Sequence, residues 1–266
     1  MRVLESTGNS FIRQLSYVGG LTLQFWSSLR ASTRVLPIVG KRGRWQTAMR
    51  QIISIGVQGL PMIGILSACV GFIVAIQTGA ELKKYGALQL VISIVAVGFT
   101  RELGPLVTAI VVSGRSGSAF SAEIGTMVAT NEIDALRTMA IDPVEFVLAP
   151  KYLAAIIAVP CLTIMSDFFG IMAGSGFMYA TTDMGLRMYL NYVADAILLR
   201  DVFFGLLKSI AFGTIIAQVG CMEGLQVHGG PEAVGRSTTS AVVKSTFLVI
   251  LADLLFTAAF YVLGAV

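Results

Sequence analysis

Five apolar runs dominate this sequence, and each is long enough to cross a lipid bilayer as a helix. They cover residues 52–78, 88–114, 152–179, 202–226 and 242–266. A bilayer core takes about 20 apolar residues of helix, and a backbone in lipid must satisfy its own hydrogen bonds, so the runs are predicted to be helical. Composition agrees, since 55% of the residues are hydrophobic and only 13% are charged. We therefore expect an all-α integral membrane protein, with residues 1–266 forming one domain and residues 52–266 its five-span bundle.

Two further segments are amphipathic rather than fully apolar. In segment 9–35, apolar residues recur every three or four positions, which predicts either a helix lying in the membrane interface or one packed on the rest of the protein. Segment 116–140, between the second and third runs, has the same kind of spacing. It is expected to be either a helix resting on the membrane surface or a docking element for a partner, and periodicity alone does not decide between them.

The distribution of Lys and Arg predicts how the five helices are oriented. Thirteen of these residues lie outside or at the ends of the runs on the side of the N-terminus, and four lie on the opposite side. Because cytoplasmic segments are enriched in Lys and Arg, the N-terminus is expected in the cytoplasm and the C-terminus outside. Segment 116–140 would then be cytoplasmic. The four on the opposite side are Lys83, Lys84, Arg187 and Arg200.

Charged side chains occur inside the apolar runs, where they are costly. They are Arg101, Glu102, Asp167, Lys208 and Asp253. An ionised group within a bilayer normally faces the bundle interior, a cavity or a partner charge. Neighbouring helix positions point about 100° apart, so Arg101 and Glu102 each need a partner from another helix. Two interpretations stay open, namely a polar cavity that receives a charged headgroup or anion, and buried ion pairs that fix helix packing.

The dipeptide Gly104-Pro105 follows the charged pair directly. Proline lacks a backbone N–H and clashes with the carbonyl of the residue four positions earlier, here Arg101. The helix is expected to kink or open at this point, and transporters use interrupted helices near the midplane as binding sites.

Several function classes lack support in the sequence. The phosphate-binding pattern GxxxxGK[ST] is absent, and His228 is the single histidine. The three cysteines have neither paired nor metal-type spacing. We therefore expect a chain that is not itself an enzyme and binds no metal or nucleotide cofactor. The net charge of +4 is explained by basic residues at the ends of the runs rather than by nucleic-acid binding.

The stretch "TRELGPLVTAIVVSGRSGSAFSAEIGTMVATNEIDALRTMAIDPVEFVLAPKYLA", residues 100–154, resembles the signature region of the MlaE/YrbE permeases. These are membrane subunits of MCE-type ABC lipid transporters. The similarity extends to "LLKSIAFG" at 206–213 and "GRSTTSAVVKS" at 235–245. Segment 116–140 is, by this resemblance, a coupling helix.

The resemblance implies a homodimer in the inner membrane of a Gram-negative bacterium that moves phospholipid and maintains outer-membrane lipid asymmetry. Implied partners are a cytoplasmic ATPase dimer that binds ATP and Mg²⁺, a periplasmic hexameric MCE-domain protein and a small STAS-domain subunit. The implied ATPase contacts are Glu123, Ile124, Met127, Glu132, Leu136, Arg137 and Met139. The implied lipid pocket holds Arg101, Glu102, Leu103 and Lys208, to which we add Ile76 and Leu207, while Asp167 and Asp253 form an intramembrane charge network.

Two other functions are also compatible with the sequence. One is a proton-coupled secondary carrier that uses Glu102, Asp167 and Asp253 as a relay and needs no ATPase. The other is a membrane scaffold that anchors an MCE protein without moving lipid itself.

Overall fold

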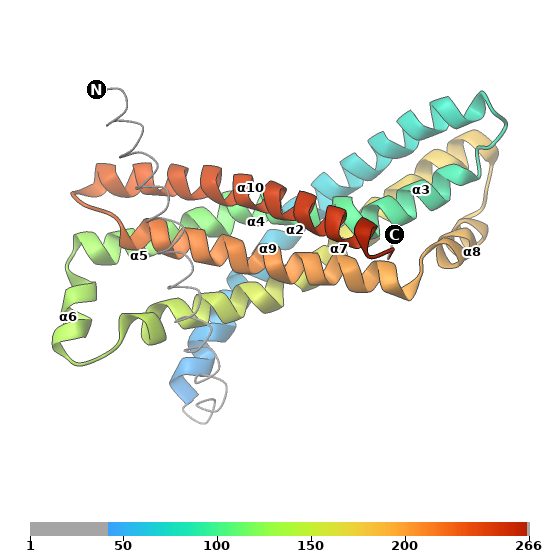
Figure 1. Ribbon diagram of the computed structural model, residues 1–266. Coiled ribbons are helices and arrows are strands. Elements are labelled where there is room, and N and C mark those ends of the chain that lie inside the picture. Colours follow the sequence, from blue (N-terminus) through green and yellow to red (C-terminus); the bar gives the residue numbers. More distant parts are fainter. Residues whose placement is uncertain (1–41, 265–266) are drawn as a thin grey trace, which may run out of the picture.

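The computed structural model describes residues 42–264, and the predicted interfacial segment 9–35 lies outside this range (Figure 1). All regular elements in the described part are helices. Five stretches are long and apolar enough to cross a membrane, which confirms the predicted number of spans. They cover Gln46–Lys83, Leu90–Ala129, Val144–Thr182, Leu199–Leu225 and Pro231–Val262. The chain is therefore a multi-pass membrane protein, and most of its helices run several residues beyond the predicted apolar limits.

The second and third spans are assembled from several helical pieces. In chain order the elements are α2 (Arg42–Lys83), α3 (Leu90–Gly98), the π-helical turn η2 (Phe99–Leu103), α4 (Gly104–Val112), the π-helical turn η3 (Ser113–Gly117), α5 (Ser118–Ala129), α6 (Glu132–Thr138), the π-helical turn η4 (Val144–Leu148), α7 (Ala149–Thr182), α8 (Leu186–Ala196), α9 (Leu199–Leu225) and α10 (Pro231–Val262).

Helix α7 runs against α2 along much of its length, and α9 packs between α7 and α10 (Figure 1). Glycine allows the α2–α7 crossing to be close, because a Cβ on Gly71 would overlap the carbonyl group of Gly170. Gly170 also lies close to the ring of Phe99, which a Cβ at this position would overlap. Most of the buried apolar side chains lie where α4, α5, α7 and α9 meet, and a second group surrounds Phe99 and α3.

The amphipathic segment 116–140 forms two helices instead of the single one expected. Helix α5 continues the second span, and α6 follows after a turn in which Asn131 has a left-handed backbone with φ of 59°. Ile133 and Leu136 of α6 are buried and belong to the main core. The turn therefore folds the amphipathic face of α6 back onto the bundle.

Helix α8 connects the third and fourth spans and was not predicted. Its Tyr189 is buried, and the hydroxyl donates a hydrogen bond of 2.7 Å to the carbonyl oxygen of Ile171 on α7. Burial raises the pKa of Tyr189 to about 12, so the hydroxyl stays protonated near neutral pH and remains a donor. This contact fixes α8 at the end of the bundle opposite α5 and α6 (Figure 1).

Candidate functional site: a charged cluster in the membrane-spanning bundle

The helix widens at the point where the sequence places Gly104-Pro105. The N–H of Gly104 bonds to the carbonyl of Phe99, five residues back, which closes a π-helical turn. Because Pro105 has no N–H to donate, the carbonyl groups one turn before it lose a helical partner. Gly205 of α9 approaches the Thr100 carbonyl so closely that a Cβ there would overlap it. The predicted kink is thus a π-helical turn, of the kind often found at functional sites.

Arg101, at this turn, pairs with α9. Its Nη2 lies 2.6 Å from Oδ1 of Asp201, and its Nε donates to the same oxygen at 2.7 Å. The second oxygen, Oδ2, accepts a hydrogen bond of 3.0 Å from the N–H of Leu198. Asp201 is almost fully buried, so a single carboxylate both caps the first turn of α9 and neutralises Arg101.

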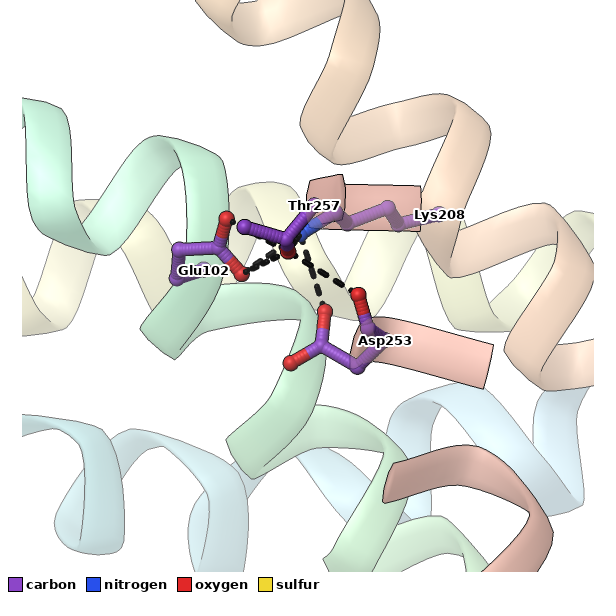
Figure 2. Close-up of polar contacts among 4 residues, drawn as sticks. All are labelled: Glu102, Lys208, Asp253 and Thr257. Carbon is purple, nitrogen blue, oxygen red and sulfur yellow. Dashed lines mark hydrogen bonds and ion pairs between the residues drawn. The ribbon is translucent and has the colours of Figure 1, made fainter. Parts of the chain in front are cut away.

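Glu102 takes a different partner, as the helical geometry predicted. Figure 2 shows the Lys208 ammonium group between Glu102 and Asp253, with Thr257 beside them. Lys208 Nζ lies 2.5 Å from Glu102 Oε2 and 2.9 Å from Asp253 Oδ1. It also donates to Thr257 Oγ1 at 2.9 Å. We call Glu102, Lys208, Asp253 and Thr257 the charged cluster; it joins η2, α9 and α10.

The charged cluster is fully hydrogen-bonded on its cationic side. Lys208 has three N–H donors and three acceptors, and its side chain is 1% exposed. Glu102, in contrast, is 38% exposed, and the Thr257 hydroxyl lies 3.1 Å from its Oε1. Two carboxylates share one ammonium group, and Glu102 is the most exposed of the three charged side chains, since Asp253 is 16% exposed.

Asp167 stands apart from the charged cluster. Its carboxylate packs on the backbone at Gly104, where a Cβ would overlap it. Oδ1 is buried and has no hydrogen-bond partner within residues 42–264. Within residues 42–264, Asp253 thus pairs with Lys208, whereas Asp167 makes no ion pair with the cluster.

The three apolar residues predicted for the lipid pocket differ in how exposed they are. Leu103 is partly buried and packs against the apolar group around Phe99. Ile76 on α2 and Leu207 on α9 are 43% and 38% exposed. Leu207 precedes Lys208 directly and therefore points to a different side of α9.

The residues predicted to contact an ATPase divide into buried and exposed groups. Ile124 and Leu136 are buried in the core, and Met127 packs against it from a partly buried position. Glu132 and Met139 are exposed, as is Arg137, which pairs with Asp134 at 3.1 Å. Glu123 lies 2.5 Å from the buried Nζ of Lys151 at the start of α7. The exposed side chains could contact a partner, and Glu123 connects them to the bundle.

Sequence reasoning missed Asp201, Thr257 and Lys151. Asp201 lies just before an apolar run and reads as a boundary charge, whereas Thr257 is one hydroxyl within an apolar run. His228 is exposed. No group of three or more His, Cys, Asp or Glu side chains within the described residues could hold a metal ion.

Comparison with known proteins identifies the class of membrane protein. A family profile described as Permease MlaE matches residues 48–259. The chain belongs to the MlaE permease family. This MlaE-family chain is 32% identical to a probable ABC transporter permease protein of Rickettsia bellii over 263 residues, which cover 98% of each chain. It is 36% identical to a probable ABC transporter permease protein of Synechocystis over 218 residues, which cover 82% of this chain and 83% of the relative.

A third relative is a chloroplast protein of Arabidopsis thaliana, TRIGALACTOSYLDIACYLGLYCEROL 1. It is 33% identical over 227 residues, which cover 85% of this chain and 65% of the relative. The MlaE-family chain is thus an ABC transporter permease, a class of membrane subunit that works with a separate ATPase.

Proposed function

We propose that this MlaE-family permease moves phospholipids between the inner membrane of a Gram-negative bacterium and a periplasmic MCE-protein channel, driven by a partner ATPase, and so maintains outer-membrane lipid asymmetry. The observation that carries the proposal is the charged cluster at the π-helical turn inside a membrane-spanning bundle. A half-exposed carboxylate beside a buried ammonium group is costly in lipid, and such groups typically mark a substrate path. The name of the Arabidopsis relative, which includes a diacylglycerol lipid, supports a lipid substrate.

The covalent path from the cluster to the exposed helices supports coupling to an ATPase. Helices α4 and α5 continue through η3 without leaving helical structure, and α6 follows at the end. Glu102 and Glu123 are 21 positions apart, which is about 30 Å of helix. ATP binding and hydrolysis in the partner subunits, which would hold ATP and Mg²⁺, would move α5 and α6. The pocket must bind lipid differently in the two resulting states for this movement to drive transport.

The exposed face of α10 supports assembly as a homodimer. Only 11% of the most apolar window of this helix is buried within the chain. Its exposed large side chains include Phe247, Ile250, Leu251, Leu254 and Leu255. Asp253 of the charged cluster is on the same helix, so a second copy packed on α10 would enclose the cluster at the dimer seam. A hexameric MCE protein and a STAS-domain subunit complete the proposed assembly.

The proposed orientation places the N-terminus in the cytoplasm and the C-terminus in the periplasm. The start of α2, helices α5 and α6, and the α9–α10 turn lie at one end of the bundle (Figure 1). Among residues 42–264, eight basic residues lie on or next to these segments and four lie toward the opposite end, which supports a cytoplasmic location for the first end. The eight are Arg42, Arg44, Arg50, Arg115, Arg137, Lys151, Arg236 and Lys244, and the four are Lys83, Lys84, Arg187 and Arg200.

Photocrosslinking of labelled phospholipid tests the central pocket. Photoreactive amino acids would replace Leu103, Ile76 or Leu207, one at a time, in the assembled complex with its ATPase and MCE partners. Lipid adducts at Leu103 that decrease when ATP is added are the expected result. Adducts at Ile76 and Leu207 that are insensitive to ATP, with none at Leu103, would indicate bulk lipid on the outer face and would refute the pocket.

The rival functions have less support from the geometry. A proton relay needs carboxylates within reach of one another, yet Glu102 and Asp253 share Lys208 while Asp167 lies apart from them. Lipid transfer without any ATPase would nevertheless favour the carrier. A scaffold would keep full transfer after Glu102→Gln while the assembly still forms.

A further inference from the structure

A cavity of about 420 Å³ lies between α2 and the junction of η3 with α5. Arg50, Ser54 and Gln58 line it from α2, and their spacing of four residues places them in one stripe along the helix. Arg115 of η3 and Glu123 of α5 line the other wall. We call this space the α2–η3 cavity. Its lining residues belong to the first part of α2, to η3 and to α5, and α5 lies at the same end of the bundle as α6 (Figure 1).

The α2–η3 cavity has an excess of positive charge. Glu123 is neutralised by Lys151, whose Nζ is 2.5 Å away and also lies 5.1 Å from the ring centroid of Phe120. Arg115 donates to two neutral acceptors, the Ser54 carbonyl at 3.0 Å and Gln58 Oε1 at 2.7 Å. Within residues 42–264, neither Arg50 nor Arg115 pairs with a carboxylate. Two guanidinium groups that have no carboxylate partner among the described residues therefore line one cavity.

The surroundings of the cavity suit an amphipathic ligand. Ile53 and Val57 lie beside the polar stripe of α2 and are 53% and 65% exposed. Both belong to the first membrane-spanning stretch, in which Arg50 is the fifth residue. Basic groups next to lipid-facing apolar side chains are the arrangement that binds anionic headgroups at a membrane surface. The apolar side chains offer a surface for acyl chains, and arginine forms paired hydrogen bonds with phosphate.

We propose that the α2–η3 cavity binds the phosphate-bearing headgroup of a phospholipid in the leaflet at the α5–α6 end of the bundle. This is a lipid site separate from the charged cluster. It rests on the proposed lipid-permease function only for the identity of its ligand, because the charge and the cavity belong to the chain itself. Arg50 and Arg115 hold the phosphate, and Ile53 and Val57 contact the chains.

Site-specific crosslinking tests this site in the full chain. A photoreactive amino acid would replace Ala119, an exposed residue that lines the cavity, and alkyne-labelled phosphatidylglycerol would be the probe. Arg50→Gln and Arg115→Gln should each lower the adduct yield about fivefold, since one basic side chain near a membrane surface contributes about that factor. Arg187→Gln on α8 removes the same charge at the opposite end and should leave the yield unchanged.

Three results would overturn the proposal. The first is an undiminished adduct in both Arg50→Gln and Arg115→Gln. The second is an equal adduct with a labelled diacylglycerol that lacks phosphate, because the chains alone would then suffice. The third is displacement of the phospholipid by inorganic phosphate at equal concentration, which would make the cavity a site for a free anion. Arg115→Gln could weaken the packing of η3 on α2, because Arg115 donates two hydrogen bonds to α2. Arg50 is exposed, so Arg50→Gln tests the site without that effect.

A second probe position separates this site from the proposed central pocket. A photoreactive amino acid at Leu103 reports the charged cluster in the same preparation. Adducts at Ala119 without any at Leu103 would refute the central pocket and leave the cavity site standing. Adducts at Leu103 without any at Ala119 would refute the cavity site and leave the central pocket standing.

Discussion

The Nζ atom of Lys208 lies 2.5 Å from Oε2 of Glu102 and joins helix α9 to the π-helical turn η2. The same ammonium group reaches Asp253 on α10, so one buried cation connects three segments of the bundle. Without it, two carboxylates would lie close together with no counter-charge, and one of them, Asp253, is mostly buried. The cluster is thus expected to hold the helices together as well as to meet a ligand.

Replacement of Lys208 by Met should lower the free energy of unfolding by about 3–5 kcal/mol, the usual cost of removing one partner of a buried ion pair. Adding Glu102→Gln and Asp253→Asn to the same chain should restore most of that loss, because no unpaired charge then remains. Thermal unfolding of the purified protein in detergent measures both effects. A Lys208→Met protein as stable as its parent would contradict this account of the cluster.

Arg101 and Asp201 should show strong energetic coupling. Asp201→Asn can still accept the Leu198 hydrogen bond, so it removes the charge but keeps the helix cap. In a double-mutant cycle with Arg101→Gln, we expect a coupling energy of about 1–3 kcal/mol in unfolding measurements, as for other residues in direct contact. A coupling near zero would mean that Arg101 serves the ligand rather than α9.

The fold could largely be predicted from hydropathy, because a membrane leaves few alternatives to helices. Charge placement was also informative, since the 100° step between Arg101 and Glu102 required separate partners. The partners Asp201 and Thr257 could not be predicted, because they depend on which face α9 and α10 turn toward η2. The isolation of Asp167 has the same cause, as its distance from the cluster depends on helix packing.

Two local features, helix α8 and the turn at Asn131, were not predicted from the sequence, for different reasons. Helix α8 carries polar residues such as Arg187, Asn191 and Asp195 among its apolar ones and is too short to span a bilayer, so it was not among the predicted helices. The turn at Asn131 leaves the apolar spacing of 116–140 almost undisturbed, so one helix was expected where two occur. Its left-handed backbone is a conformation that asparagine adopts more readily than most residues.

Gly71→Ala should destabilise the protein by about 1–3 kcal/mol, the usual cost of overpacking a close contact. The added methyl group would overlap the carbonyl of Gly170 and force α2 away from α7. Gly98→Ala is the matched control, since a Cβ there meets nothing within 4 Å and alanine favours the helix. Unfolding temperatures of the two variants give the comparison. Equal temperatures would show that the α2–α7 crossing tolerates a wider separation.

Lys151→Met should uncouple α5 from α7 while the bundle remains folded. Glu123 is 51% exposed, so water can solvate it once its partner is removed, and the loss of stability should be small. Helix α5 would nevertheless lose its polar link to the start of α7. In the reconstituted complex, we expect lipid-stimulated ATP hydrolysis to fall about threefold to tenfold, within the range found when a residue between two sites is changed.

Lys84→Met is the appropriate control for this last experiment. Lys84 also pairs with a glutamate, Glu81 at 2.9 Å, but both side chains are exposed and lie at the far end of α2. Such a surface pair contributes at most about 0.5 kcal/mol, so neither stability nor ATP hydrolysis should change. Glu123→Gln should also lower lipid-stimulated ATP hydrolysis, because it removes the charge of the same ion pair. It should cost more stability than Lys151→Met, because the buried Lys151 ammonium group then has no counter-charge. Full lipid stimulation in both Lys151→Met and Glu123→Gln would exclude this ion pair from the coupling path and leave the buried side chains of α5 and α6 to carry the movement.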